Sequence, residues 1–326
     1  MLTVCICTHK PNPVSLERVV HALRDQTLTP ADWELLIVES GCRDCVEGVV
    51  ELSWKPGVRL FCEERPGKTF AMAMGVREAK GNAVVFVDDD NVLAPDYLIN
   101  LAELLQTHPR VAVFSAEITP EYARTPPEWI GAFARFLAIR TLERDVWANV
   151  DAPSASPVGA GMCVRREVAD QFVRLLERDR FLHDFGRSST SLRAGTDDTI
   201  FGWIAFDLGF GCGAFKALRH THLIGAQRIE HSYLRRIAMD ITYSHTVLAW
   251  HFGVVKGSRL GQIRRHAVSC VRAVLSCSPY QLSARIACFR GFWLAMRDTR
   301  SGRIPLVTGS ITEVRWTPKI GSEEKL

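Results

Sequence analysis

Short apolar, β-branched runs alternate with segments of helical periodicity through the first third of the chain. Four such runs predict buried strands, at residues 3–8, 33–38, 58–62 and 83–87. The last run has no polar position, so we expect other elements to cover both of its faces. Apolar residues at helical spacing behind Ser15, the expected N-cap, predict a helix between the first two strands.

This alternation predicts the fold class, because strands that alternate with helices form βαβ units around a parallel sheet. We therefore expect an α/β fold with a mostly parallel central sheet. Prolines between 119 and 158 indicate a change of topology, and from 232 onward the pattern is helical, with basic and apolar faces. The predicted organisation is a main domain, residues 1–230, in two halves (1–118 and 119–230), followed by a helical C-terminal region, residues 231–326.

The composition is that of an ordinary globular chain and excludes disordered and fibrous classes. The chain has 326 residues, of which 47% are hydrophobic and 23% charged. Ten cysteines are too few for a disulfide scaffold, and the first residues lack the basic-then-apolar pattern of a secretory signal. These features predict a cytoplasmic protein with free thiols.

The net charge of +4 is unevenly distributed along the chain. Residues 1–230 hold 25 basic and 31 acidic residues, whereas residues 231–326 hold 15 and 5. The basic region has no RNA-binding motif or interleaved aromatic platform, so a nucleic-acid partner is not expected. Two interpretations of the region stay open. Its helices either pack on the sheet or on a second copy in a homodimer, or they lie peripherally on an anionic membrane at its cytoplasmic face.

Three consecutive aspartates, Asp88, Asp89 and Asp90, directly follow the all-apolar strand predicted at 83–87. Bunched carboxylates repel one another, and a divalent cation such as Mg²⁺ or Mn²⁺ relieves that repulsion. In extended chain, Asp88 and Asp90 face the same way and Asp89 faces away. We therefore expect Asp88 and Asp90 to face the ligand, with Asp90 as the direct metal ligand.

A second acidic pair, Asp197 and Asp198, opens the apolar run at 199–208. Such a pair can simply stabilise a helix start. Coupled to a metal–phosphate site, however, transfer to a hydroxyl needs a general base near the attacking oxygen. Asp198 is the candidate base, with Asp197 beside it.

The order of these motifs resembles family 2 glycosyltransferases with the GT-A fold. The resemblance covers about residues 2–230 and includes the first strand, the acidic end of the second strand at Glu39, the segment 65–75 with Gly67 and Lys68, the triple aspartate, and Thr196-Asp197-Asp198 in place of the family's Thr-Glu-Asp. Two departures from the family pattern stand out. Ser40 replaces a second acidic residue, and Met72-Ala73 replaces an Arg-Asn pair.

The resemblance implies an inverting, metal-dependent transfer of sugar from a nucleoside-diphosphate sugar to a hydroxyl-bearing glycan or lipid-linked acceptor. It makes 1–118 the nucleotide-sugar half and 119–230 the acceptor half. The residues expected to bind the donor are Thr8, Glu39, Lys68, Asp88 and Asp89. Those expected to hold Mn²⁺ or Mg²⁺ are Asp90, Asp88 and His222, and the catalytic pair is Asp198 and Asp197.

Two other function classes stay open from the sequence. A nucleotidyltransferase can carry a strand-end metal site on a similar sheet, although its glycine-rich loop is missing from residues 8–13. A catalytically inactive module that binds a sugar or a lipid carrier would share the fold, but it would have no need of the two aspartate groups.

Overall fold

The computed structural model describes residues 1–41, 48–185, 196–254 and 279–301, together with residues 261, 263, 264, 268, 304 and 311. Its strands are β1 (Leu2–Thr8), β2 (Trp33–Ser40), β3 (Arg59–Glu63), β4 (Ala83–Asp88), β5 (Asn91–Leu93), β6 (Val111–Tyr122), β7 (Val146–Ala148), β8 (Met162–Arg165) and β9 (Gly211–Ile224). Its α-helices are α1 (Pro13–Arg24), α2 (Lys68–Glu78), α3 (Tyr97–Thr107), α4 (Arg166–Arg178), α5 (Asp197–Asp207), α6 (His231–His251) and α8 (Pro279–Arg300). Its 3₁₀ segments are η1 (Pro30–Asp32), η2 (Glu128–Leu137), η3 (Arg180–Asp184) and η4 (Ala226–Ile229).

The strands form one sheet in the order β3-β2-β1-β4-β8-β6-β9-β5, with β7 paired to β9. The first four strands in this order are parallel, as the sequence predicted. Beyond β4 the sheet is mixed, since β8 runs antiparallel to both of its neighbours and β6 runs parallel to β9. The α/β class is therefore confirmed, and the change of topology begins where the chain leaves the βαβ pattern.

Both faces of the parallel half are covered, because side chains alternate between them along each strand. In β1, Val4 and Ile6 join a core with α1 and α3, whereas Cys5 and Cys7 join a core with α2, α4 and α5. The same alternation in β4 confirms the expectation for the all-apolar run. One helix start was predicted wrongly. The Asn12 side chain, not Ser15, caps α1, with Oδ1 accepting from the Ser15 amide at 3.1 Å.

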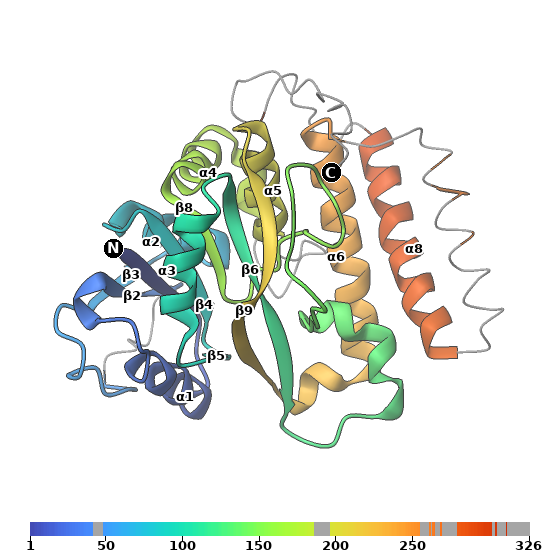
Figure 1. Cartoon of the computed structure of the whole chain (residues 1–326). Helices are drawn as coiled ribbons and strands as arrows, with labels where there is room; N and C mark the ends of the chain where they lie inside the picture. The colour runs from blue at the N-terminus through green and yellow to red at the C-terminus, as the bar shows by residue number, and fades with distance from the viewer. Residues whose placement is uncertain are drawn as a thin grey trace.

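The C-terminal helices pack against each other and against η2, on the flank of the molecule away from α1 (Figure 1). Phe133 and Leu137 of η2 share a core with Leu234 of α6 and Ala284 of α8. The division predicted at 230/231 falls at the start of α6, whereas that at 118/119 falls inside β6. Within the described residues, no helix combines the length and the apolar character needed to cross a membrane.

The expectation of free thiols holds at most of the described cysteines. Five are free and buried: Cys5, Cys7, Cys163, Cys212 and Cys288. Cys62 on β3 is disulfide-bonded, so the expectation is wrong at that position.

Gly291 sets the approach of α8 to α6. A Cβ at this position would lie 2.2 Å from the backbone carbonyl oxygen of Met239. Backbone cannot move aside as a flexible side chain can, so we expect Gly291→Ala to lower the free energy of unfolding by ~1–3 kcal/mol, as overpacking does. Urea denaturation measures this change. Gly225→Ala is the control, because nothing lies within 4 Å of its Cβ position. Equal losses in the two variants would contradict the close approach.

Candidate active site

The predicted donor residues lie at the carboxyl ends of neighbouring parallel strands. Thr8 pairs in register with Glu39 on β2, and Cys7 pairs with Asp88 on β4. In open α/β sheets ligands bind at this edge. Ser40, which replaces the family's second acidic residue, has a structural task here. Its hydroxyl accepts the Gly67 amide at 2.7 Å and so fixes the turn that begins α2.

The three consecutive aspartates have three different environments. Lys68 Nζ pairs with Asp88, and the hydroxyl of Thr8 donates to Asp89. Burial is the main cause that raises the pKa of Asp89 to about 6, and the Thr8 hydrogen bond opposes it. The strand ends at Asp88 and the next two residues form a turn. The extended chain assumed for all three aspartates is therefore wrong beyond Asp88.

Asp90 and His222 both contact the guanidinium of Arg228. The Nδ1 atom of His222 lies 2.8 Å from the carbonyl oxygen of Leu137, which can only accept, so Nδ1 carries the hydrogen. The lone pair of Nε2 then faces Asp90 Oδ2, 3.4 Å away. Between them lies Arg228, whose Nη1 is 2.7 Å from Asp90 Oδ2 and 3.0 Å from His222 Nε2. The sequence had given Arg228 no role.

The predicted three-residue metal set is not brought together. In the part of the chain that the structure describes, no group of three or more His, Cys, Asp or Glu side chains could hold a metal. The pair Asp90 and His222 nevertheless suits one. A cation bound to both at ~2.0–2.2 Å would put their donor atoms ~3 Å apart, and such ions often take the rest of their ligands from phosphate and water. Arg228 would have to yield its place between them.

Asp198 has the surroundings of a tuned general base. Its Oδ2 accepts the Gly159 amide at 3.1 Å and its Oδ1 the Thr199 amide at 2.7 Å. Burial outweighs these hydrogen bonds and raises the pKa of the Asp198 carboxyl above its ordinary value. The carboxylate is thus oriented by backbone donors and is a stronger proton acceptor than a solvated aspartate.

Asp197 has a different surrounding. It is 7% exposed, and its Oδ1 lies 2.7 Å from the hydroxyl of Thr69 in α2. The same hydroxyl lies 2.7 Å from the carbonyl oxygen of Phe185. These contacts hold the start of α5 against α2, so Asp197 positions the helix that presents Asp198.

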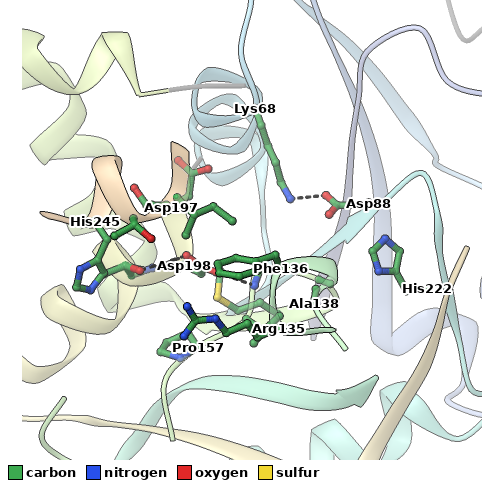
Figure 2. Close-up of a pocket in the computed structure, with 18 of the residues that line it drawn as sticks. Lys68, Asp88, Arg135, Phe136, Ala138, Pro157, Asp197, Asp198, His222 and His245 are labelled. Carbon is green, nitrogen blue, oxygen red and sulfur yellow. Dashed lines mark hydrogen bonds and ion pairs between the residues drawn. The ribbon is translucent and has the colours of Figure 1, made fainter. Parts of the chain in front are cut away.

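A cavity of about 650 Å³ joins these groups, and Figure 2 shows Asp198, the Lys68–Asp88 pair and His222 around it. Of the predicted site residues, it brings together Lys68, Asp88, Asp197, Asp198 and His222. The cavity lining does not include four of the predicted site residues, which lie at the ends of β1, β2 and β4: Thr8, Glu39, Asp89 and Asp90. Several lining side chains were missed by the sequence analysis: Arg135, Phe136, Arg228, Thr242, His245 and Arg285.

His245 of α6 illustrates why these residues were missed. It lines the cavity, its ring lies edge-on to Trp203 with centroids 5.7 Å apart, and enclosure by protein lowers its pKa. Nearby Asp151 and Asp198 oppose that shift. A single histidine in an amphipathic helix carries no pattern that points to a site, so only the packing of α6 over α5 places it there.

The chain belongs to glycosyl transferase family 2, whose family model matches residues 3–171. A curated relative, the uncharacterized protein y4gI of Sinorhizobium fredii, is 26% identical over 113 residues. The match covers 33% of this chain and 12% of that protein, so the chain spans a small part of that relative's length.

Two solved structures are similar to this chain. A mannosyltransferase of Pyrobaculum calidifontis, PcManGT, in complex with GDP-Man and Mn²⁺, superposes with a TM-score of 0.55 at 17% identity, covering 91% of this chain and 87% of its own. TarS 1-349 of S. aureus in complex with UDP-GlcNAc gives a TM-score of 0.47 at 15% identity, covering 92% of each chain. The family match and the superposition on PcManGT confirm the GT-A fold.

The Asp90–His222 pair predicts how the protein responds to Mn²⁺. In the presence of UDP or GDP, we expect Asp90→Asn to weaken Mn²⁺ binding by more than the ~10–100-fold typical of losing an outer-shell partner. His222→Gln should also weaken it, because the amide is a poorer ligand than imidazole. Electron paramagnetic resonance titration of free Mn²⁺ measures both effects. Asp96→Asn is the control, since Asp96 is an exposed partner of Arg219. Unchanged affinity in Asp90→Asn would remove Asp90 from the metal site.

Proposed function

We propose that this protein is an inverting, metal-dependent glycosyltransferase that moves a sugar from a nucleoside-diphosphate sugar to a hydroxyl acceptor in glycan or polysaccharide biosynthesis. The observation that carries the proposal is the Asp198 carboxylate. It is held by the Gly159 and Thr199 amides in a cavity that also contains the Lys68–Asp88 pair. A base and a diphosphate site in one cavity are what a single displacement at an anomeric carbon needs.

The donor side of the site is assigned to the strand ends. Thr8 and Glu39 would contact the nucleoside, with Asp89 held beside Thr8. Lys68 and Asp88 would contact the diphosphate and the sugar from the start of α2 and the end of β4. Support comes from the family and from PcManGT, which has the same fold and whose structure holds GDP-Man and Mn²⁺.

Asp90 and His222 would hold the divalent ion, Mn²⁺ or Mg²⁺. When bound, such an ion supplies charge neutralisation at the departing diphosphate. Arg228 would have to move when the ion binds, because its guanidinium occupies the position between Asp90 and His222. Released from Asp90, its guanidinium is free to donate to diphosphate oxygens from the same end of the cavity.

The chemical step then follows from the position of Asp198. An acceptor hydroxyl oxygen attacks the anomeric carbon from the face opposite the diphosphate, and its proton passes to the Asp198 carboxylate. The new glycosidic C–O bond forms as the bond to the phosphate oxygen breaks, and the electron pair of the broken bond leaves with the diphosphate. One displacement inverts the anomeric configuration.

Membership of glycosyl transferase family 2 argues against the nucleotidyltransferase alternative. A catalytically inactive module that binds a sugar or a lipid carrier would bind nucleotide sugar without turnover. Measured transfer or hydrolysis of nucleotide sugars across a donor panel separates that alternative from an enzyme.

Substitution of the proposed base tests the mechanism. We expect Asp198→Asn to lower kcat by ~10²–10⁴-fold, because the amide keeps the shape but cannot accept the proton. Affinity for the nucleoside diphosphate should stay close to wild type. Steady-state kinetics and calorimetry measure the two quantities. Asp207→Asn, at the last residue of the same helix, is the control. Near wild-type turnover in Asp198→Asn would assign the base elsewhere.

The pH dependence gives a second, independent measure. A base works only when ionised, so kcat/KM should fall as the pH drops through the raised pKa of Asp198. The acid limb should therefore lie above the ~3.9 of an ordinary aspartate. The residual activity of Asp198→Asn should not show this limb. An acid limb that persists unchanged in the variant would belong to another group.

The C-terminal helices also suggest where the enzyme works. Several apolar side chains of this region are buried, including Val247, Leu248, Phe252 and Phe292. The outer face of α8, however, exposes Arg290, Trp293 and Arg297, with Trp293 at 53%. The single acidic residue of α8, Asp298, is bonded to Tyr243. We propose that this face rests on an anionic membrane surface, on the cytoplasmic side, where lipid-linked acceptors reside.

Vesicle sedimentation tests this placement. We expect the protein to sediment with anionic vesicles, less so at high salt, because each basic side chain near the surface contributes ~1 kcal/mol and salt screens it. Trp293→Ala should weaken sedimentation, whereas Trp147→Ala should not, although Trp147 on β7 is 55% exposed. Equal recovery in the supernatant with anionic and neutral vesicles would contradict membrane contact. Dimers in sedimentation velocity would then point to a second copy on this face.

A further inference from the structure

The cavity has a second wall that the catalytic sheet does not supply. Its lining residues from this wall come from η2, α6 and α8: Arg135, Phe136, Ile241, Thr242, His245, Thr246, Arg285 and Cys288. No residue in this set is acidic, whereas the sheet side and the start of α5 contribute Asp88, Asp197 and Asp198. The two sides of the cavity therefore differ in charge.

Two arginines on this wall have no carboxylate partner in the described part of the chain. Arg135 donates from Nη2 to the sulfur of Cys288, 3.1 Å away, and a thiol is a weak acceptor. Its guanidinium also lies over the ring of Phe136, 4.4 Å from the centroid. Arg285 lines the cavity from α8 with an exposed side chain. Both guanidinium groups keep donors that can serve a ligand.

The other cations of the cavity are differently placed. Lys68 pairs with Asp88, and Arg228 pairs with Asp90 and His222, at the edge of the sheet assigned to the donor diphosphate. Figure 2 shows Arg135 apart from the Lys68–Asp88 pair, on the side of the cavity where Pro157 is drawn. A nucleoside diphosphate held at the strand ends would thus leave Arg135 and Arg285 unneutralised.

From this charge distribution we infer that Arg135 and Arg285 form a binding subsite for an oxyanion, a phosphate or a carboxylate, carried by the acceptor. The inference rests on the proposed transfer reaction, since it takes the ligand on this wall to be the acceptor. It narrows the acceptor class from any hydroxyl-bearing glycan to one that is anionic close to the reacting hydroxyl.

The chemistry of the wall agrees with such a ligand. A guanidinium group presents planar paired donors that match carboxylate and phosphate oxygens. The contact with Phe136 restrains the Arg135 guanidinium, and its donors other than the one directed at Cys288 stay available to a ligand. Along α6, Thr242 and Thr246 donate their hydroxyl hydrogens to the carbonyl oxygens of Ala238 and Thr242. Both threonines line the cavity, and their hydroxyl oxygens keep lone pairs that can accept from sugar hydroxyls.

The cavity is also large enough for more than the reacting sugar. Its volume of about 650 Å³ lies in the range of sites that enclose drug-sized ligands, ~300–1,000 Å³. A donor sugar and an anionic acceptor sugar can share such a space. Asp198 lines the same cavity, so an acceptor anchored at the arginines would lie beside the base.

Anion binding to the intact protein tests the subsite. Inorganic phosphate, glucuronate and neutral glucose are titrated by calorimetry into the full chain saturated with Mn²⁺ and UDP or GDP. We expect saturable binding of phosphate, glucuronate or both, and none of glucose. Arg135→Gln and Arg285→Gln each remove charge-assisted hydrogen bonds, so each should weaken binding of the anion by ~10-fold or more. The anion that binds tells a phosphate-bearing acceptor from a carboxylate-bearing one.

Matched variants distinguish binding at the two arginines from nonspecific attraction of anions to a basic protein. Arg300→Gln removes the same charge from an exposed position of α8 outside the cavity and should leave anion affinity unchanged. Arg285→Lys should keep part of the affinity because it keeps the charge. Thermal unfolding of each variant shows whether it is folded. Binding of neither anion, equal binding in all variants, or loss of anion binding when nucleotide is added would each overturn the subsite.

The same titrations without nucleotide distinguish a failure of this inference from a failure of the proposed function. Failure of UDP, GDP and the rest of a nucleotide panel to bind with Mn²⁺ would count against the glycosyltransferase proposal itself. Arginine-dependent anion binding would still be measured in that case. Nucleotide binding without any arginine-dependent anion binding would leave the transfer reaction in place and remove only the anionic acceptor.

Discussion

The site depends on one constraint: the charges of five neighbouring carboxylates must be balanced by cations or hydrogen-bond donors. A partly buried negative charge is costly unless a cation or hydrogen-bond donors face it. Each of the five aspartates at this end of the sheet contacts a different partner: Asp88 meets Lys68, Asp89 meets Thr8, Asp90 meets Arg228, Asp197 meets Thr69, and Asp198 meets backbone amides. These partners come from segments far apart in the sequence. The charges therefore tie α2, β1 and η4 to the strand ends and to α5.

That arrangement divides the carboxylates by the chemistry open to them. Asp90 and His222 face one cation position, at present taken by Arg228. Asp198 instead meets neutral donors, and its burial raises its pKa, so it is suited to accept a proton. Similar side chains are thus suited to different chemistry, electrostatic binding at the strand ends and proton acceptance in the cavity, because their partners differ in charge.

The C-terminal helices complete the cavity. Close contact at Gly291 brings α8 against α6, and η2 packs on both, so that arginines from η2 and α8 reach the same space as Asp198. Of the two roles expected for this region, packing explains its buried apolar residues, whereas the outer face of α8 stays open to solvent. The helices α6 and α8, which lie outside the residues matched by the family model, supply several of the side chains that line the cavity.

Much of the fold could be predicted from the sequence because it depends on local pattern. The first strands follow runs of apolar residues, and the parallel sheet follows from their alternation with helices. The predictions that failed relied on local geometry that longer-range packing changed. The chain turns after Asp88, so the extended backbone expected for the three aspartates ends there, and Asn12 instead of Ser15 caps α1.

The sequence by itself determined the α/β class, the strand-end position of the aspartates and the family, since these depend on periodicity and motif order. Only the tertiary structure decided which donors meet each carboxylate, because Lys68, Thr69 and Arg228 approach from elements whose separation along the chain says nothing of their distance in space. It also decided that the basic C-terminal region turns Arg285 and His245 toward the cavity. Helical periodicity marks a buried face, but what that face is packed against is a property of the folded chain.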